Sequence, residues 1–354
     1  MIPTVTGGNV LVFSLILRVV IRFAMPHLFR LLLLLGLLTL PDAAQAQYRR
    51  VSVGFYNTEN LFDTVPSPFY DDREFTPDGE KRWNTERYRC KLTRIARVID
   101  DAGFDLIALA EVENEAVVRD LVATLGDDYC YLHRTSSDSR GIDLALLYKG
   151  DKFFPVEVRL LPSGFGREWF YVRGSLIGEE VALLVAHLPS KYNSRERRAR
   201  AAERLLRTAD SLLQAGHKRL IVLGDFNGQL DEPPLRSLFS PCSDGSLAAG
   251  QLSDALHSTA TRQGTYCWDG RWVAYDHILV SQALLSGDGL RMRRGGIFIR
   301  DYLLENPLPG QRNLPRRTFR GSRYLGGYSD HLPVFIVLER QFAHSGENPY
   351  IRNP

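Results

Sequence analysis

The sequence is poor in cysteine and has almost no excess of one charge, and each absence excludes a class of protein. Four cysteines in 354 residues are too few for a scaffold held together by disulfides. With 44 Lys and Arg against 41 Asp and Glu, the formal net charge is only +3. The chain is therefore not a histone-like polycation, and any affinity for nucleic acid must come from a local basic patch.

Short-period repeats and biased segments are also missing. A charged fraction of 24%, together with 18 Phe, 15 Tyr and 4 Trp, is typical of a globular protein with a large core rather than of a disordered chain. Nothing marks a linker between domains. We therefore expect a single α/β domain over residues 47–340, followed by a tail at 341–354.

The apolar run in the segment that begins at Met25 is short for a membrane span. This run, at residues 31–40, follows Arg30 and is about ten residues long, half of the roughly 20 that a membrane span needs. With Ala44-Gln45-Ala46 after it, the segment from Met25 predicts a signal peptide cleaved after Ala46. We expect export to the periplasm or the medium; a membrane anchor is the alternative. Residues 1–24 precede this complete signal and have no assigned role.

Apolar runs and helical spacings alternate along the rest of the chain. Helices are predicted around Tyr88–Ile99, closed by Gly103, and over residues 194–215, closed by Gly216. Buried strands are predicted at residues 51–56, 104–110, 142–148, 181–186, 220–223, 275–280 and 333–338. Long polar loops are expected at residues 63–82, 229–263 and 304–327. The alternation of strands and helices indicates an α/β fold.

Acids, amides and histidines gather where these strands end. They are Asn57, Glu59, Asn60, Glu111, Glu113, Asn114, His187, Asp225, Asn227, Asp330 and His331. One such residue alone is usually a turn former or a helix cap. Many at corresponding strand ends predict a site at one edge of a sheet, because turns do not need carboxylates, amides and imidazoles together.

Seven short motifs carry a resemblance to a known family. They are Tyr56-Asn57-Thr58-Glu59-Asn60-Leu61-Phe62, Leu109-Ala110-Glu111-Val112, Gly141-Ile142-Asp143-Leu144-Ala145, Ala186-His187-Leu188, Gly224-Asp225-Phe226-Asn227, Tyr275-Asp276-His277-Ile278-Leu279 and Ser329-Asp330-His331-Leu332-Pro333. In this order, over residues 51–340, the chain resembles the endonuclease/exonuclease/phosphatase superfamily of DNase I-like nucleases, exonuclease III-like enzymes, sphingomyelinases and inositol polyphosphate phosphatases. The resemblance implies a four-layer α/β sandwich, with two mixed β-sheets packed face to face and helices outside.

The resemblance also implies a divalent-metal site. Glu111 and Asn57 are its expected oxygen ligands, and Asp330 is a further candidate. We expect Mg²⁺, with Mn²⁺ or Ca²⁺ as alternatives, and the family leaves one or two ions open. Because Mg²⁺ keeps several waters and takes few carboxylates, a sparse protein shell suffices.

Two histidines are the implied proton-transfer groups. His331 would take a proton from water, and His187 would stabilise or protonate the leaving oxygen. By resemblance, Asp276 orients His331 and Asp143 orients His187. The alternatives are that Asp276 caps a turn and that Asp143 pairs with Arg140. Asp225 and Asn227 would orient the nucleophile and phosphate, or hold a second metal.

Nine arginines lie between residues 291 and 323, interleaved with aromatics. They are Arg291, Arg293, Arg294, Arg300, Arg312, Arg316, Arg317, Arg320 and Arg323. Such a loop suits a nucleic-acid backbone, although a solvated charged loop is the alternative. A second cluster follows His187 and consists of Arg195, Arg197, Arg198 and Arg200; because these residues spread around a helix, only some of them can face the cleft. Our candidates for phosphate contact are Arg140, Lys191, Arg195, Arg320 and Arg323.

These observations predict an exported, metal-dependent phosphodiesterase, with a nuclease acting on DNA or RNA as the first hypothesis. The alternatives are a phospholipid or inositol-phosphate hydrolase and an inactive binding module. No stable protein partner is indicated, and we expect a monomer. Finally, DNase I-like enzymes carry a disulfide in the corresponding region, which implies a Cys242–Cys267 pair.

Overall fold

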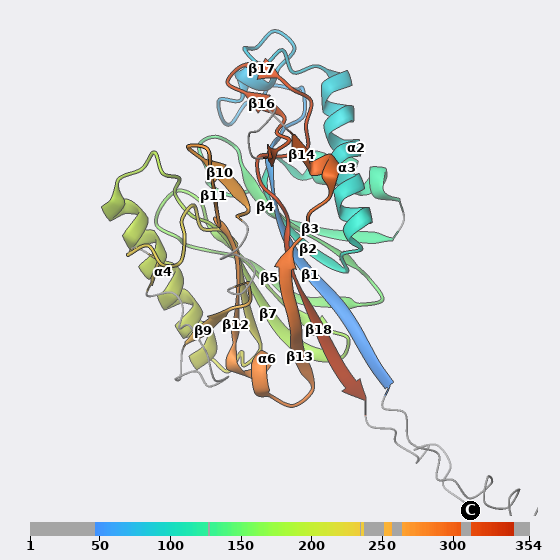
Figure 1. Ribbon diagram of the computed structural model, residues 1–354, viewed down its shortest axis with the longest axis vertical. Coiled ribbons are helices and arrows are strands. Elements are labelled where there is room, and N and C mark those ends of the chain that lie inside the picture. Colours follow the sequence, from blue (N-terminus) through green and yellow to red (C-terminus); the bar gives the residue numbers. More distant parts are fainter. Residues whose placement is uncertain are drawn as a thin grey trace, which may run out of the picture. The chain divides into compact units, whose positions relative to one another are not determined.

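Two six-stranded sheets form the framework of the protein (Figure 1). The computed structural model describes residues 47–126, 128–233, 235–236, 251–256, 264–305 and 313–342. Within it, Tyr48–Gln341 makes one compact unit. The expected signal peptide at residues 1–46 lies outside the described residues, as does nearly all of the expected tail.

Each sheet mixes parallel and antiparallel pairs. In order across the first sheet, the strands are β13 (Leu290–Ile297), β18 (Val334–Phe342), β1 (Gln47–Leu61), β2 (Leu106–Val112), β4 (Asp143–Lys149) and β3 (Tyr129–His133). Across the second they are β5 (Phe153–Leu161), β6 (Trp169–Leu176), β7 (Glu179–His187), β8 (Leu220–Asp225), β12 (Asp276–Ser281) and β9 (Leu252–Asp254). The pairs β1–β2 and β7–β8 are parallel, whereas β2–β4, β6–β7 and β8–β12 are antiparallel.

The apolar runs form strands because both faces of each strand are buried. In β7, Val181, Leu183 and Val185 belong to a core shared with the first sheet. The alternate residues of β7 belong to a second core with α4 (Arg195–Gln214). A continuous apolar run is therefore required, since successive side chains point to opposite faces of a sheet.

The helices lie on the outer sides of the two sheets. Figure 1 shows α4 beside the second sheet and α2 (Thr85–Ala102) and α3 (Glu115–Leu125) beside the first. Asn84 caps the start of α2 by accepting a hydrogen bond from the Arg87 N–H. Gly103 ends it in the left-handed conformation, φ 64°, as predicted. The predicted α/β sandwich of two mixed sheets is thus confirmed.

The remaining elements are short. They are the helices η1 (Arg73–Phe75), α6 (Gln282–Ser286) and η3 (Asp301–Leu303) and the strand pairs β10 (Tyr266–Trp268) with β11 (Arg271–Val273), β14 (Leu304–Glu305) with β15 (Leu314–Pro315), and β16 (Phe319–Arg320) with β17 (Arg323–Tyr324). No helix in the described part of the chain is long and apolar enough to cross a membrane.

The arginine-rich stretch is not the single loop that we expected. Arg291, Arg293 and Arg294 belong to strand β13, and Arg293 forms an ion pair with Glu339 (2.5 Å). The β13 segment is a strand because it pairs along β18, a long-range contact that its composition does not reveal. Among the described arginines of this stretch, Arg317 is the one that contacts residues of the expected site.

Candidate active site

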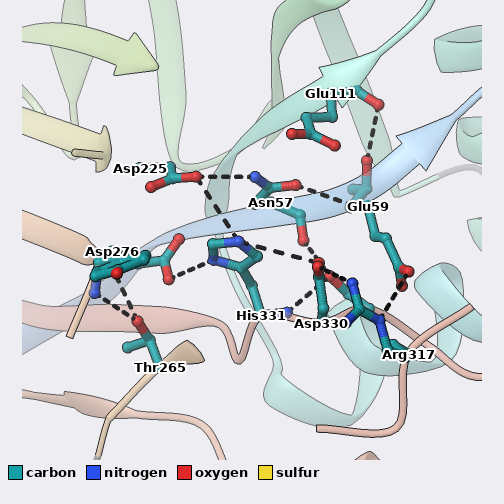
Figure 2. A network of polar contacts seen from close by, with 12 residues as sticks. Asn57, Glu59, Glu111, Asp225, Thr265, Asp276, Arg317, Asp330 and His331 are labelled. Atoms are coloured by element: carbon teal, nitrogen blue, oxygen red, sulfur yellow. Dashed lines mark hydrogen bonds and ion pairs between the residues drawn. The ribbon is translucent and has the colours of Figure 1, made fainter. Parts of the chain in front are cut away.

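The polar strand ends of both sheets meet at one edge. In the second sheet, His187 of β7 is the register partner of Asp225 of β8, which is the partner of Asp276 of β12. Three functional side chains thus stand in one row across three strands. Figure 2 shows the groups that the first sheet adds, Asn57 and Glu111, and those that precede β18.

A left-handed turn within β1 shapes the part of the site that the first sheet contributes. Glu59 and Asn60 have φ of 53° and 54°, a conformation uncommon for residues other than glycine. Their consecutive N–H groups donate to Asn57 Oδ1 (3.0 Å) and Glu111 Oε2 (2.9 Å). The β1–β2 register shifts here, and Glu111 itself has φ 61°. Such irregularities at a strand end redirect side chains, here toward the cleft.

His331 lies between two carboxylates. Its Nδ1 is 2.8 Å from Asp276 Oδ2, and its Nε2 is 3.7 Å from Asp225 Oδ2 (Figure 2). Burial alone would lower the pKa of His331, but the charges of Asp276 and Asp225 outweigh it and raise the pKa well above the usual value. Since Nδ1 faces Asp276, Nε2 is the ring atom that exchanges protons with the cleft.

The surroundings of His187 act in the opposite sense. Its Nε2 lies 3.6 Å from Asp225 Oδ2 and 3.8 Å from Glu111 Oε1. Burial, followed by the charges of Arg167 and Arg140, lowers the pKa of His187 well below the usual value. Without a cation bound, His187 is therefore the neutral histidine of the site.

Asp225 stands at the centre of the site. Asn57 Nδ2 donates to its Oδ2 (3.1 Å), and the Asn227 N–H donates to its Oδ1 (2.8 Å). Burial, with Asp276 and Glu111 nearby, raises the pKa of Asp225 to about 7, although His331 opposes the shift. Asn227 is held in turn, because its Nδ2 donates to the Leu188 carbonyl (2.9 Å).

The donor chemistry of the site fits a hard divalent cation. Glu111, Asp225 and Asp330 line one cleft together with both histidines. Asp225, Asp276 and His331 also place one ligand atom each within 4.8 Å of one another, and Asp276 Oδ1 is buried without a hydrogen-bond partner among the described residues. A cation would offset the negative charges of Asp276 and Glu111 that raise the pKa of Asp225, and carboxylate and amide oxygens suit Mg²⁺, Mn²⁺ or Ca²⁺. Asp276 is already paired with His331, so Glu111, Asn57, Asp225 and Asp330 remain the candidate ligands.

A charged network that sequence reasoning missed supports Asp330 from behind. Arg317 Nη2 is 2.7 Å from Asp330 Oδ2, and Arg317 Nε is 3.6 Å from Glu59 Oε1 (Figure 2). Glu59 also accepts the N–H of Thr318 (2.5 Å), and Lys91 donates to the Thr318 hydroxyl (2.5 Å).

Two charged groups of this network are buried, and burial shifts the pKa of each. Burial, assisted by Asp330, raises the pKa of Glu59 to about 7. Burial likewise lowers the pKa of Lys91 to about 8. Lys91 sits on the apolar face of α2 three residues after Tyr88, a polar interruption that could have marked it in the sequence.

The pairing of Asp143 with His187 requires a correction. Asp143 Oδ2 is instead 2.9 Å from His133 Nε2, and its Oδ1 accepts the Ser136 N–H (2.9 Å). His133 ends β3, which pairs with β4 where Asp143 begins, so the sheet itself brings these two together. The alternative partner, Arg140, does not hold the Asp143 carboxylate either.

Only two of the five predicted phosphate-contact residues line the cleft. Arg140 and Lys191 line the cleft, whose volume is about 560 Å³. Arg195, Arg320 and Arg323 do not line it, because Arg195 faces solvent at the start of α4 and the other two lie in the exposed β16–β17 pair. Arg197 of the second arginine cluster lines the cleft, and so does Arg167, which was not a candidate.

The expected disulfide stays a prediction. Cys242 lies outside the described residues, and Cys267 is a free cysteine in the structure, as are Cys90 and Cys130.

Clustered carboxylates and two histidines at the strand ends of an α/β sandwich define the class to which the protein belongs. Residues 52–340 match the Endonuclease/Exonuclease/phosphatase family, and the chain belongs to this family. Its members are nucleases and phosphatases, which are hydrolases that act on phosphoester bonds. No curated protein matches the sequence significantly.

Solved structures share the fold at low sequence identity. An endonuclease/exonuclease/phosphatase family protein from Bacteroides thetaiotaomicron is 17% identical, with a TM-score of 0.55, covering 84% of this chain and 100% of that one. A mannosyl-6-phosphatase from the same organism is 18% identical, with a TM-score of 0.53, covering 81% and 99%. A humanised TDP2 from D. rerio is 14% identical, with a TM-score of 0.54, covering 82% and 98%.

Proposed function

We propose that the protein is an exported, divalent-metal-dependent phosphodiesterase that hydrolyses DNA or RNA. The observation that carries the proposal is the pair of buried histidines, both aimed at Asp225, of which His331 is bonded to Asp276 at 2.8 Å. Phosphodiester cleavage needs a base for water and a hydrogen-bond donor for the leaving oxygen, and two histidines on either side of the same carboxylate can supply them.

The side chains divide this work by position. Asp276 holds Nδ1 of His331, so that Nε2 faces the attacking water. A divalent cation beside Asp225 would offset part of the negative charge that raises the pKa of His331, and the neutral imidazole would then take the proton of the water. Neutral His187 donates a hydrogen bond to the departing oxygen. Asp225 and Asn227 orient water and phosphate between them. A divalent cation held by Glu111, Asn57, Asp225 and Asp330 would offset negative charge on the phosphoryl oxygens.

Cations in the cleft support a polymeric phosphate substrate. Arg140, Arg167, Lys191 and Arg197 line it with the histidines. Among the described residues, Arg140 has no ion-pair partner, whereas Arg167 pairs with Asp138 (2.8 Å) and Lys191 with Glu232 (2.7 Å). A charged group without a partner is available for a phosphate oxygen.

Export rests on the sequence of the N-terminal segment, with its basic start, short apolar run and Ala44-Gln45-Ala46. N-terminal sequencing of the protein recovered from cell fractions tests it. A mature chain that begins at Gln47 outside the cytoplasm is expected, and an intact N-terminus retained in the cytoplasm would contradict it.

A panel of substrates tests the activity. Purified protein is incubated with plasmid DNA, RNA, sphingomyelin, inositol phosphates and sugar phosphates, with Mg²⁺, with Mn²⁺ and with EDTA. We expect cleavage of nucleic acid that requires the metal and is lost in His331→Ala. Turnover of a sugar phosphate alone would favour the small-molecule alternative, for which the structural likeness to a mannosyl-6-phosphatase is the supporting observation. Absence of turnover on every substrate would leave the binding-module hypothesis.

A further inference from the structure

Two large aromatic side chains are exposed at the active-site cleft. Tyr192 is 91% exposed and Trp268 is 38% exposed, and both line the cleft together with His187 and His331. Their rings contact each other edge to face, with centroids 6.2 Å apart. Exposed aromatic surface is unfavourable in water, so a pair of such rings beside an active site calls for a ligand.

Further aromatic rings connect this pair to His331. Tyr266 and Trp268 are two apart in β10, so they share one face of the hairpin. The Tyr266 ring lies 4.7 Å from the His331 ring, and the backbones of these two residues form a β-bridge. Behind it, Tyr275 stacks on Tyr266 at 5.2 Å. Because residues i and i+2 of a strand are roughly 7 Å apart, Trp268 stands about one such step from Tyr266, whose ring lies beside His331.

A ligand for this cleft has to satisfy both aromatic faces and cations. Arg140, Arg167, Lys191 and Arg197 line the same cavity, which suits phosphate groups. Flat rings next to phosphates at regular intervals are the chemistry of a nucleic-acid strand. In a duplex the faces of each base are covered by its neighbours, so only an unpaired base can lie on an exposed ring.

The geometry points to a stacking subsite in which Trp268 and Tyr192 hold an unpaired nucleobase next to the phosphate that is cleaved. This inference rests on the proposed nuclease function and deepens it, because it makes single-stranded or frayed nucleic acid the preferred substrate. Tyr266 is a positioning residue within it, since it joins the hairpin to His331. Base stacking on aromatic rings tolerates every base, so little sequence preference is expected.

Binding tests the subsite separately from cleavage. In a His331→Ala background, the affinity for a short labelled single strand, for its duplex and for the same strand with abasic sites is measured by fluorescence anisotropy. Trp268→Ala is expected to weaken binding of the single strand roughly 5- to 150-fold. Binding of the abasic strand should change little, and Trp268→Phe should restore most of the affinity. Tyr192→Ala is expected to act in the same direction with a smaller effect.

Phe154→Ala is the matched control, because Phe154 is 70% exposed but lies on strand β5 and does not line the cleft. Unchanged single-strand affinity in Trp268→Ala, equal losses on the intact and abasic strands, or no single-strand binding at all would overturn the subsite. If single strands bind through Trp268 but no variant with His331 intact cleaves them, the nuclease function fails while the subsite stands.

Discussion

Charged groups occupy two neighbouring regions of the molecule, the floor of the cleft and the network behind Asp330. The contacts of the histidine Nε2 atoms on the floor are longer than the closest contacts of the network, although Arg317 Nε and Glu59 Oε1 in the network also lie 3.6 Å apart. On the floor, Nε2 of His187 lies 3.6 Å from Asp225 and 3.8 Å from Glu111, and Nε2 of His331 lies 3.7 Å from Asp225. These distances are too long for good hydrogen bonds. Behind the floor, Arg317 meets Asp330 at 2.7 Å, and Lys91 meets the Tyr328 carbonyl at 2.6 Å. The long distances on the floor leave room for reactants, whereas the short contacts of the network hold its side chains in place.

The largest effect should come from the floor. His331→Ala removes the proposed base, so we expect kcat to fall roughly 10²- to 10⁴-fold while the protein stays folded. Cleavage of the preferred substrate is measured with saturating metal. His217→Ala is the matched control, because His217 is partly buried but bonds to Tyr171, and it does not line the cleft. Comparable losses in both variants would mean that the floor is not where the chemistry occurs.

A smaller loss is expected from the network. Arg317→Met frees Asp330, and loss of such an orienting partner typically lowers metal affinity or activity about 10- to 100-fold. We therefore expect the Mg²⁺ concentration for half-maximal rate to rise, with partial recovery at high Mg²⁺. Arg317→Lys should recover part of the effect. A drop in kcat at unchanged Mg²⁺ requirement would show that Arg317 does not act through Asp330.

Lys91 is expected to make the stability of the folded protein depend on pH. Its pKa is about 8 in the folded state and 10.5 ordinarily, so between these pH values the unfolded chain holds more protons. Wild-type stability therefore gains a contribution as pH rises through this window, of the order of 1–3 kcal/mol, while below pH 8 the penalty for burying the charge is fully present. Glu59, with a pKa of about 7, is already ionised there.

Lys91→Met removes this titration. Urea unfolding at both ends of the window should show that wild type gains stability relative to Lys91→Met as pH rises. A difference between the two proteins that stays constant with pH would mean that Lys91 is not buried as a charge.

The smallest effect concerns Arg140 at the mouth of the cleft. Arg140→Ala removes a cation without an ion-pair partner among the described residues, so we expect a rise in KM of several-fold with little change in kcat. The slope of log binding affinity against log salt concentration should also become shallower by about one, because one phosphate contact is lost. Arg195→Ala, which does not line the cleft, should change neither quantity.

The sequence predicted the floor better than the network. The floor residues lie directly at the ends of apolar strands, so the end of each apolar run predicts their position. His187 and Asp225 are examples. Lys91 of α2 contacts a loop more than two hundred residues further along the chain, and Arg317 of that loop pairs with Glu59 of β1. No local sequence pattern predicts such contacts. Asp143 was given the wrong partner for the same reason, because strand β3 was not predicted and His133 lies at its end.

The row formed by His187, Asp225 and Asp276 ties catalysis to the correctness of folding. These residues are register partners across three strands, so a slip of one residue in either ladder would turn a required side chain to the opposite face of the sheet. Chains with shifted strands would be compact yet inactive. Specific activity is therefore a sensitive assay of native strand pairing, and after refolding it can distinguish correctly paired molecules from those that have only recovered their secondary structure.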